Sequence, residues 1–475
     1  MPLLPGSDRG RRLVAIGAAL ALVVPLAWMW WSSRLPDSYD AAQMGYADYG
    51  DGPLPTASEH AHQHGTAVAD LVETKPGRPD RSFTLTVRDD GDRITVNGKT
   101  PGPLLRLKRG QLVEVRLVND DVADGITLHW HGLDVPNAMD GVAGVTQDAV
   151  MPGHSFTYRF VADQVGTYWY HSHQLSHQQV RRGLLGAIVV EDAPERDVVA
   201  VLHQYARATL NGATGTTAVP VAPGQTVRVR VVNTDNALAA VWVIGAPYRI
   251  VAVDGTDLHG PTPVTDRAVT VTAGGRVDLR ITVPEGGARV DFGGTTALVL
   301  GKDRSAGSQP TAFVDLMSYG TPTDPGLAAD KPDRTFDYRI GRRLGFLDGK
   351  PGRWWTINGH QFPDVPMFMV DEGDVVVVRL ENHSGESHPM HLHGHHALVL
   401  SRNGVWSTGS PWWVDSLEVG TNESWQIAFR ADNPGLWMDH CHNLPHASEG
   451  LVAHLMYAGV SSSFRIGGPA RNEPE

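Results

Sequence analysis

Apolar and polar residues follow two different patterns along this chain of 475 residues. Residues 13–31 form one apolar run without a charged side chain. The rest of the chain alternates apolar and polar positions in short segments bounded by Gly, Pro, Asn and Asp. An alternation with period two is typical of half-buried β-strands. The pattern therefore predicts one apolar helix near the N-terminus, followed by an all-β body.

The alternating segments include a motif that occurs three times, at residues 96–119, 210–233 and 357–382. Each copy carries Asn-Gly near its start, a Pro-containing connection, then Gly-Gln or Gly-Asp, and an alternating strand that closes with Asn. The copies are too far apart for a solenoid repeat, and their spacing suits whole β-sandwich domains. We predict three homologous sandwiches at about 76–193, 194–329 and 330–460, with the residues up to 475 counted with the third.

The apolar run near the N-terminus has the layout of an export signal, because Arg9, Arg11 and Arg12 precede it. It is long enough to span a bilayer, and Trp28 and Trp31 near its end suit the membrane interface. No small-residue cleavage site follows the run. We therefore expect residues 1–34 to be an uncleaved membrane anchor rather than a cleaved signal peptide, which places the body outside the cytoplasm.

Residues 35–75 are rich in Pro, Gly, Ala and Asp and show no sustained apolar period, so they predict a flexible linker between anchor and body. The linker includes His60, His62 and His64. A solvated polar tract is the favoured interpretation of these histidines, and a copper-collecting arm is the alternative.

Composition agrees with a turn-rich β protein, because the chain has 52 glycines and 32 prolines. The formal net charge of −12, without a basic run, argues against a nucleic-acid partner. Cys441 is the only cysteine. In an exported protein it cannot form an internal disulfide, so it is either a buried bystander or a metal ligand.

Four short stretches each contain one His-x-His pair. Residues i and i+2 of a strand point to the same face, so each pair presents two imidazoles to one point. Eight imidazoles without a thiolate suit copper or zinc, and they exceed the needs of one mononuclear site. They predict a cluster of several ions between the first and third sandwiches. The pairs are His129 and His131, His171 and His173, His391 and His393, and His440 and His442.

Cys441 lies between His440 and His442, so the same alternation turns its side chain away from the face that its neighbours use. A thiolate with two imidazoles, here His388 and His446, is the trigonal set of a blue-copper electron-transfer site, and it is a poor structural zinc site. Leu451 stands where a weak axial thioether is usual, so we expect a high reduction potential. Consecutive residues would join the two kinds of site in an electron relay.

In this order and with this spacing, the four stretches resemble the copper signatures of the three-domain multicopper oxidases, a family that includes laccases, ascorbate oxidase and bilirubin oxidase. The resemblance covers about residues 76–460. It implies three cupredoxin-like Greek-key sandwiches and four copper ions per chain. It also implies a reaction in which four one-electron oxidations of a donor reduce O₂ to two waters.

The resemblance also assigns each ligand. It implies that His388, Cys441 and His446 bind type 1 copper, that His129 and His391 bind type 2 copper, that His131, His171 and His442 bind one type 3 copper, and that His173, His393 and His440 bind the other. Asp140 occupies the place of an acid that supplies protons in the family, although an Asp-Gly turn also explains it. Some bacterial laccases have an acid where this chain has Ala447, which leaves Glu449 as a weak second candidate.

The residues leave more than one class of electron donor open. A laccase-like oxidase of phenols or aromatic amines, with the edge of His446 as the electron path, is the leading hypothesis. An oxidase of Cu(I) or Fe(II) is the alternative, and it would need carboxylates or Met near the type 1 site, such as Glu386 or Met390. A two-domain nitrite reductase and a non-catalytic copper carrier leave most of the histidines unexplained.

The middle repeat, with His203 and His259 only, is expected to be structural or to shape a substrate pocket. His396 and His454 are expected to be ordinary surface or core residues.

Overall fold

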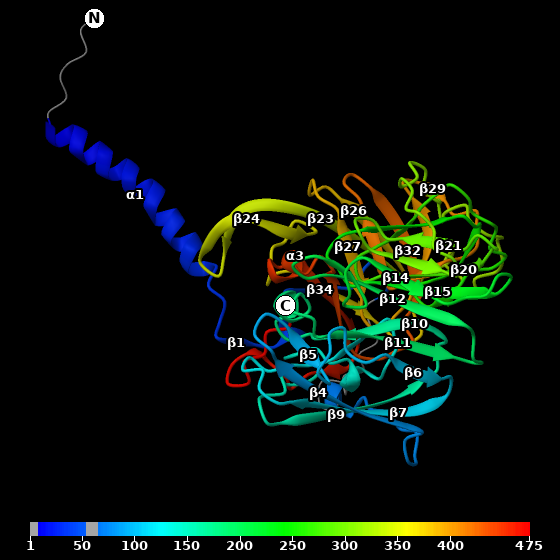
Figure 1. Ribbon diagram of the computed structural model, residues 1–475. Helices are drawn as coiled ribbons and strands as arrows, with labels where there is room; N and C mark the ends of the chain where they lie inside the picture. The colour runs from blue at the N-terminus through cyan, green and yellow to red at the C-terminus, as the bar shows by residue number, and fades with distance from the viewer. Residues whose placement is uncertain (1–7, 54–64) are drawn as a thin grey trace, which may run out of the picture.

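The computed structural model describes residues 8–53 and 65–475 and shows a β-rich body from which one long helix projects (Figure 1). The helix is α1 (Asp8–Ser32), and its segment Gly10–Ser32 is long and apolar enough to cross a membrane. This apolar segment of α1 is not buried against the body. The predicted all-β fold class and the apolar N-terminal helix are thus confirmed.

The first sandwich consists of two four-stranded sheets, with strand orders β5-β4-β7-β9 and β6-β11-β10-β8. Its own apolar interior is built around Trp130, Tyr158 and Tyr170. Short helical segments η3 (Asn137–Met139) and α2 (Ser176–Gln179) connect its strands. The strands are β4 (Arg81–Asp89), β5 (Ile94–Val96), β6 (Leu105–Lys108), β7 (Gln111–Asn119), β8 (His129–His131), β9 (Ser155–Ala162), β10 (Gly166–His171) and β11 (Leu185–Glu191).

The second sandwich has sheets with strand orders β13-β12-β15-β20-β17-β18 and β14-β22-β21-β16-β19. Its apolar interior is continuous with that of the third sandwich. Its strands are β12 (Asp197–Gln204), β13 (Ala208–Leu210), β14 (Thr216–Val219), β15 (Thr226–Asn233), β16 (Ala239–Ile244), β17 (Tyr248–Val253), β18 (Thr256–Asp257), β19 (Val269–Val271), β20 (Arg276–Thr282), β21 (Ala288–Asp291) and β22 (Ala297–Leu300).

The third sandwich has sheets with strand orders β24-β23-β26-β32-β28-β29 and β2-β25-β34-β33-β27-β31, where β2 is Tyr46–Asp48, and β30 pairs with β28. The helix α3 (Leu444–Ser448) follows β33. The strands are β23 (Arg334–Leu347), β24 (Lys350–Ile357), β25 (Pro366–Val370), β26 (Val375–Asn382), β27 (His388–Leu392), β28 (Ala397–Arg402), β29 (Val405–Trp406), β30 (Trp413–Val414), β31 (Ser416–Val419), β32 (Ser424–Arg430), β33 (Leu436–Cys441), β34 (Val452–Tyr457), β35 (Val460–Ser461) and β36 (Ile466–Gly467). Both predicted boundaries, 193/194 and 329/330, fall between strands of different sandwiches.

The three sequence repeats occupy equivalent places in the three sandwiches. Their strands β7, β15 and β26 each pair in parallel with the first strand of their sandwich and antiparallel with a later one. The Asn that closes each repeat is fully buried, and its amide donates to backbone carbonyls of neighbouring loops. These residues are Asn119, Asn233 and Asn382. A buried amide that pairs loop carbonyls explains why each repeat ends with Asn.

The expectation of a flexible linker at residues 35–75 does not hold for the parts that the structure describes. Strand β2 (Tyr46–Asp48) forms an edge of the third sandwich, β1 (Ser38–Tyr39) pairs with β36, and β3 (Thr66–Ala67) pairs with β35. The turns η1 (Ala41–Gln43) and η2 (Val68–Asp70) each bury an apolar side chain in the core of the second and third sandwiches. Isolated apolar residues of this kind produce no periodic pattern. His60, His62 and His64 lie outside the described residues.

Candidate metal centres

The four His-x-His pairs lie at the ends of two adjacent pairs of strands. Strands β8 and β10 of the first sandwich are antiparallel neighbours, with His129 opposite His171. Strands β27 and β33 of the third sandwich are also antiparallel neighbours, with His391 opposite His440. Cross-strand partners point to the same face of a sheet, so each strand pair gathers its imidazoles at one end. The two ends face each other across the boundary between the first and third sandwiches.

The eight imidazoles form three groups, and within each group the ring nitrogens lie within 4.8 Å of one another. His129 Nε2 is 3.4 Å from His391 Nε2, and His393 Nε2 is 3.2 Å from His440 Nε2. All eight rings are buried, with at most 1% of each residue exposed. The groups are His129, His131 and His391; His131, His171 and His442; and His173, His393 and His440. The structure thus brings together all the histidines of the predicted cluster. The second and third groups are the two type 3 sets that the family resemblance implies, and the first is the implied type 2 pair together with His131.

The ring nitrogens inside the cluster suit a metal. His131 Nδ1, His171 Nε2, His173 Nε2 and both nitrogens of His442 are buried without a hydrogen-bond partner among the described residues. An orphaned buried nitrogen is costly, and a bound cation would satisfy it. Burial and the neighbouring imidazoles lower the pKa of His131, His171, His173, His391, His393 and His442. Neutral imidazole is the form that binds a metal, so the cluster fits copper.

In seven of the eight rings the opposite nitrogen lies next to an acceptor outside the cluster, and His442 is the exception. Such acceptors fix the orientation and tautomer of a metal-binding histidine. Asp140 serves two rings, because its Oδ1 is 3.0 Å from His129 Nδ1 and its Oδ2 is 3.0 Å from His393 Nδ1. The others are Asp415 Oδ1 at 3.1 Å from His131 Nε2, Asp415 O at 2.7 Å from His391 Nδ1, Ser172 O at 3.0 Å from His171 Nδ1, Pro474 O at 3.1 Å from His173 Nδ1 and Glu475 Oε1 at 3.0 Å from His440 Nδ1.

Sequence reasoning found Asp140 and missed Asp415 and Glu475. Asp140 is eleven residues from His129, inside the same motif region. Asp415 and Glu475 reach the cluster from a separate strand connection and from the end of the described chain. No local spacing signals either residue, because only the tertiary fold brings them to the histidines.

A second site lies on the other face of β33. Cys441 Sγ is 3.6 Å from His388 Nδ1 and 3.8 Å from His446 Nδ1, and the two Nδ1 atoms are 3.2 Å apart. Burial, helped by the nearby His446, lowers the pKa of His388 to about 3, and burial raises the pKa of the Cys441 thiol. A thiolate in this place therefore needs a bound cation, which the two neutral imidazoles help to hold. A cysteine and two histidines in trigonal reach fit a blue-copper site.

Leu451 is fully buried beside this site. Its carbonyl accepts from the Cys441 N–H at 3.1 Å, and its own N–H donates to the His446 carbonyl at 3.0 Å. These bonds fix the Leu451 backbone next to two of the three expected ligands. Met390 lies directly opposite Cys441 on β27 and is 5% exposed, so it faces the interior of the sandwich and not the solvent.

The outer edge of His446 reaches the surface. Its Nε2 is 3.4 Å from Glu386 Oε2, and the two side chains are 13% and 48% exposed. Arg342 donates to Glu386 at 2.5 Å and lies over the ring of Trp355, which packs against both His388 and His446. Glu449 accepts from Trp355 Nε1 at 3.0 Å, so it lies at this site and not at the histidine cluster.

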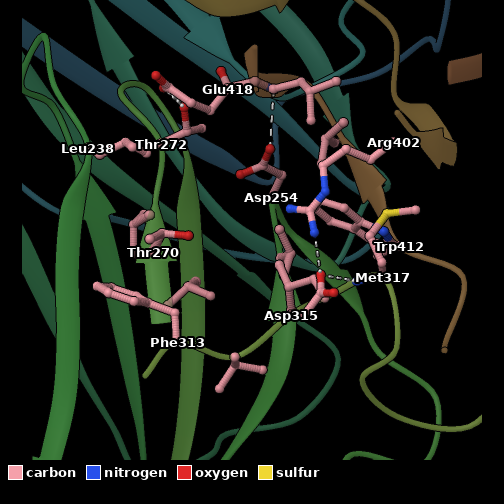
Figure 2. A pocket seen from close by; sticks show the side chains of 18 of the residues that line it. Leu238, Asp254, Thr270, Thr272, Phe313, Asp315, Met317, Arg402, Trp412 and Glu418 are labelled. Atoms are coloured by element: carbon pink, nitrogen blue, oxygen red, sulfur yellow. Dashed lines mark hydrogen bonds and ion pairs between the residues drawn. The ribbon is translucent and has the colours of Figure 1, made fainter. Parts of the chain in front are cut away.

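The second sandwich contributes to both the cluster and a cavity. Gly274 adopts a φ of 78°, and a Cβ there would lie 2.8 Å from His442 Cδ2, so only glycine lets this loop approach the cluster. A cavity of about 390 Å³ lies between the second and third sandwiches. Figure 2 shows Thr272 and Phe313 on one side and Arg402 and Trp412 on the other, with Glu418 beside Thr272, whose hydroxyl donates to its carboxylate at 3.0 Å. The middle repeat thus lines a cavity, and its use as a substrate pocket stays a prediction.

Comparisons with known proteins agree with this geometry. The chain is 28% identical to an iron transport multicopper oxidase of Epichloe festucae, over 80% of this chain and 74% of that protein. It is 27% identical to Laccase-1 of Botryotinia fuckeliana, over 79% and 80% of the two chains. The structure resembles that of a multicopper oxidase from Pseudomonas thermotolerans, with a TM-score of 0.65 and 28% identity over 80% of this chain and 100% of that one.

Two sequence models, both described as multicopper oxidase, match residues 82–195 and 336–459. These two segments are the first and third sandwiches, which carry all the histidine pairs and Cys441. The fold, the two sites and the matches lead to one conclusion: this chain belongs to the multicopper oxidase family.

Proposed function

We propose that this copper-dependent oxidoreductase is laccase-like, with phenols or aromatic amines as its electron donors and O₂ as acceptor. The observation that carries the proposal is the edge of His446, which is partly exposed and flanked by Glu386. A phenolic hydroxyl at this edge can donate a hydrogen bond to the Glu386 carboxylate while its ring lies close to the imidazole. An outer-sphere donor needs no more than such a contact.

Within this proposal, His388, Cys441 and His446 hold type 1 copper, and the three histidine groups hold the type 2 ion and the type 3 pair. Copper at these sites supplies one-electron redox chemistry and the four-electron reduction of O₂. The protein supplies the path, because His440 directly precedes Cys441, His442 directly follows it, and the two histidines belong to different histidine groups. Asp140 holds two rings and is placed to pass protons to the same region.

O₂ uptake by the copper-loaded protein, with a phenol, Fe(II) and Cu(I) compared under equal conditions, tests the proposal. The phenol should give the highest kcat/KM. Glu386→Gln should lower kcat/KM for the phenol by about 10- to 100-fold, the value of a hydrogen bond to a charged group. Glu381→Gln is the control, because Glu381 is similarly exposed and pairs with His383 instead. An unchanged phenol kcat/KM in Glu386→Gln contradicts the proposed donor site.

Oxidation of Fe(II) or Cu(I) is the second candidate function. Glu386 favours it, since a carboxylate beside the type 1 histidine can hold a metal-ion substrate, and one relative is named an iron transport oxidase. The same carboxylate is paired with Arg342, whose charge opposes a cation, and Met390 faces the interior. A Cu(I) or Fe(II) turnover far above that of phenols would establish this candidate in place of the first.

We also propose that α1 anchors the protein to a membrane and that the body lies on the extracytoplasmic side. Arg11 and Arg12 precede the apolar segment, which fits the positive-inside rule, and the spanning window of α1 is not buried against the body. Alkaline extraction of membranes tests the anchor, because a spanning helix stays with the lipid. N-terminal sequencing of the mature protein shows whether residues 1–34 are retained.

A further inference from the structure

The end of the proposed anchor is bound to one hairpin of the body. Asp348 N–H donates to the Ser33 carbonyl at 2.9 Å, and Gly349 N–H donates to Ser33 Oγ at 3.1 Å. Arg34 Nε is 3.4 Å from Asp348 Oδ1. These contacts attach the chain that leaves α1 to the turn between β23 and β24, which Figure 1 shows as the part of the body nearest the helix. The turn between β23 and β24 is therefore held next to the C-terminal end of α1.

This hairpin has a surface unlike that of the whole chain. Leu344 is 82% exposed, and Arg343, Lys350 and Arg353 are exposed beside it. Arg353 lies opposite Leu344 across the two strands. The protein has a net charge of −12, so three exposed cations on one short hairpin differ from the overall charge. A hairpin that exposes an apolar side chain together with Lys and Arg suits the headgroup layer of an anionic bilayer. Trp30 and Trp31, at the end of α1, suit the same layer.

We propose that the β23–β24 hairpin is a second membrane contact, which rests on the anionic headgroup layer of the bilayer that α1 spans. This inference rests on the proposed anchor and adds to it a surface on the body. Leu344 enters the interface, and Lys350 and Arg353 pair with lipid phosphates. The body is thus held in one orientation and does not swing freely from the end of α1.

The same hairpin belongs to the electron-accepting site. Trp355 on β24 packs against His388 and His446, and Arg342 on β23 binds Glu386. Trp355 is five residues from Lys350, or about 17 Å along the strand. Contact of the hairpin with lipid holds the edge of His446 close to the membrane surface. Donors that partition into the interface are then concentrated at the site that oxidises them.

A label at residue 344 tests the contact. Cys441 is the only cysteine and is buried, so Leu344→Cys provides one accessible thiol. The full chain, labelled with an environment-sensitive dye, is inserted through α1 into nanodiscs that contain phosphatidylglycerol and a lipid with a nitroxide near its headgroup. Val405→Cys is the control, because Val405 is 67% exposed on β29, which Figure 1 shows far from α1. The nitroxide should quench the dye at 344 and not at 405.

Charge reversal separates lipid contact from mere proximity. Lys350→Glu with Arg353→Glu, in the Leu344→Cys background, should lose most of the quenching, because each cation near an anionic bilayer contributes about fivefold to binding. Reversal of Lys108 and Lys302, which are exposed on other sandwiches, is the matched control and should leave quenching unchanged. Retention of the blue absorption shows that each variant is folded. Equal quenching at 344 and 405 in inserted protein overturns the hairpin contact, whereas failure of the chain to enter nanodiscs overturns the anchor.

Discussion

Arg276 and Asp415 form a bidentate ion pair at the junction of all three sandwiches. Arg276 Nη1 and Nη2 lie 2.6 and 2.5 Å from the two Asp415 oxygens, and both side chains are at most 1% exposed. Arg276 Nε also donates to the Thr167 carbonyl of the first sandwich. Asp415 in turn contacts His131 and accepts from His391 through its carbonyl. A residue of the copper-free second sandwich thus supports two of the proposed copper ligands.

Removal of Arg276 should damage both stability and the cluster. Burial alone raises the pKa of Asp415, but Arg276, helped by His396, holds it below its usual value, so Arg276→Met leaves a buried carboxylate without its bidentate partner. Such a change typically costs about 3–5 kcal/mol. Denaturant unfolding measures this loss, and copper analysis should show fewer than four ions per chain. Equal stability and full copper content would show that Asp415 does not depend on Arg276.

Cys441→Ser should abolish the blue absorption and donor oxidation but leave the histidine cluster in place. The serine oxygen is a poor substitute for a thiolate at a blue-copper site, whereas all eight cluster histidines remain. Copper analysis should fall from four ions per chain toward three. Donor oxidation that persists without the blue band would mean that electrons reach the cluster without passing through Cys441.

Leu451→Met should lower the reduction potential of the type 1 site. Hydrogen bonds hold the Leu451 backbone next to Cys441 and His446, and a thioether there can act as the weak axial ligand, which stabilises the cupric form. Redox titration of the blue band measures the shift. Leu444→Met is the control, since Leu444 packs in a different apolar cluster with Trp169. A potential that does not fall would mean that residue 451 is not at the axial position.

The parts of the site that rest on strand alternation could be predicted from the sequence, because the two side chains of a His-x-His pair on a strand point to the same face of the sheet. Cys441 and its two neighbours are the clearest case. Asp140 could be predicted, but the acceptors Asp415 and Glu475 could not, since they approach the histidines only after the sandwiches pack and the last residues return to the first sandwich. The three repeats indicated the β-sandwiches correctly. The docking of residues 38–48 escaped prediction because single buried residues such as Ala41 and Met44 produce no period.

His396 should make stability depend on pH above neutrality. Its Nδ1 is 3.3 Å from Asp134 Oδ1 of the first sandwich, and its Nε2 is 3.4 Å from Asp415 Oδ2 of the third. Burial lowers the pKa of His396, but the two carboxylates outweigh burial and raise it to about 10. His396 is thus a core residue outside the metal-binding groups, as expected, and its two carboxylate partners come from different sandwiches.

A raised pKa means that the stabilisation is complete below the unfolded value of about 6.5 and is lost as pH rises toward 10. Between pH 6.5 and pH 9 the loss is on the order of 3 kcal/mol. Denaturant unfolding of the natural protein and of His396→Gln should differ most near pH 6, and the difference should shrink toward pH 10. A difference that stays constant with pH would show that His396 is neutral in the folded protein.

Asp140→Asn should slow turnover without emptying the cluster. The amide oxygen can still accept from one of the rings that Asp140 now serves, so the histidines stay close to their places. The amide cannot carry a proton as a carboxyl group does, and loss of a general acid–base group typically costs a factor of about 10² to 10⁴. Turnover with saturating phenol should fall by about that factor while copper content and the blue band remain. Asp140→Glu keeps a carboxylate and should recover part of the lost rate, whereas equal losses in both variants would show that Asp140 acts only by holding the rings in place.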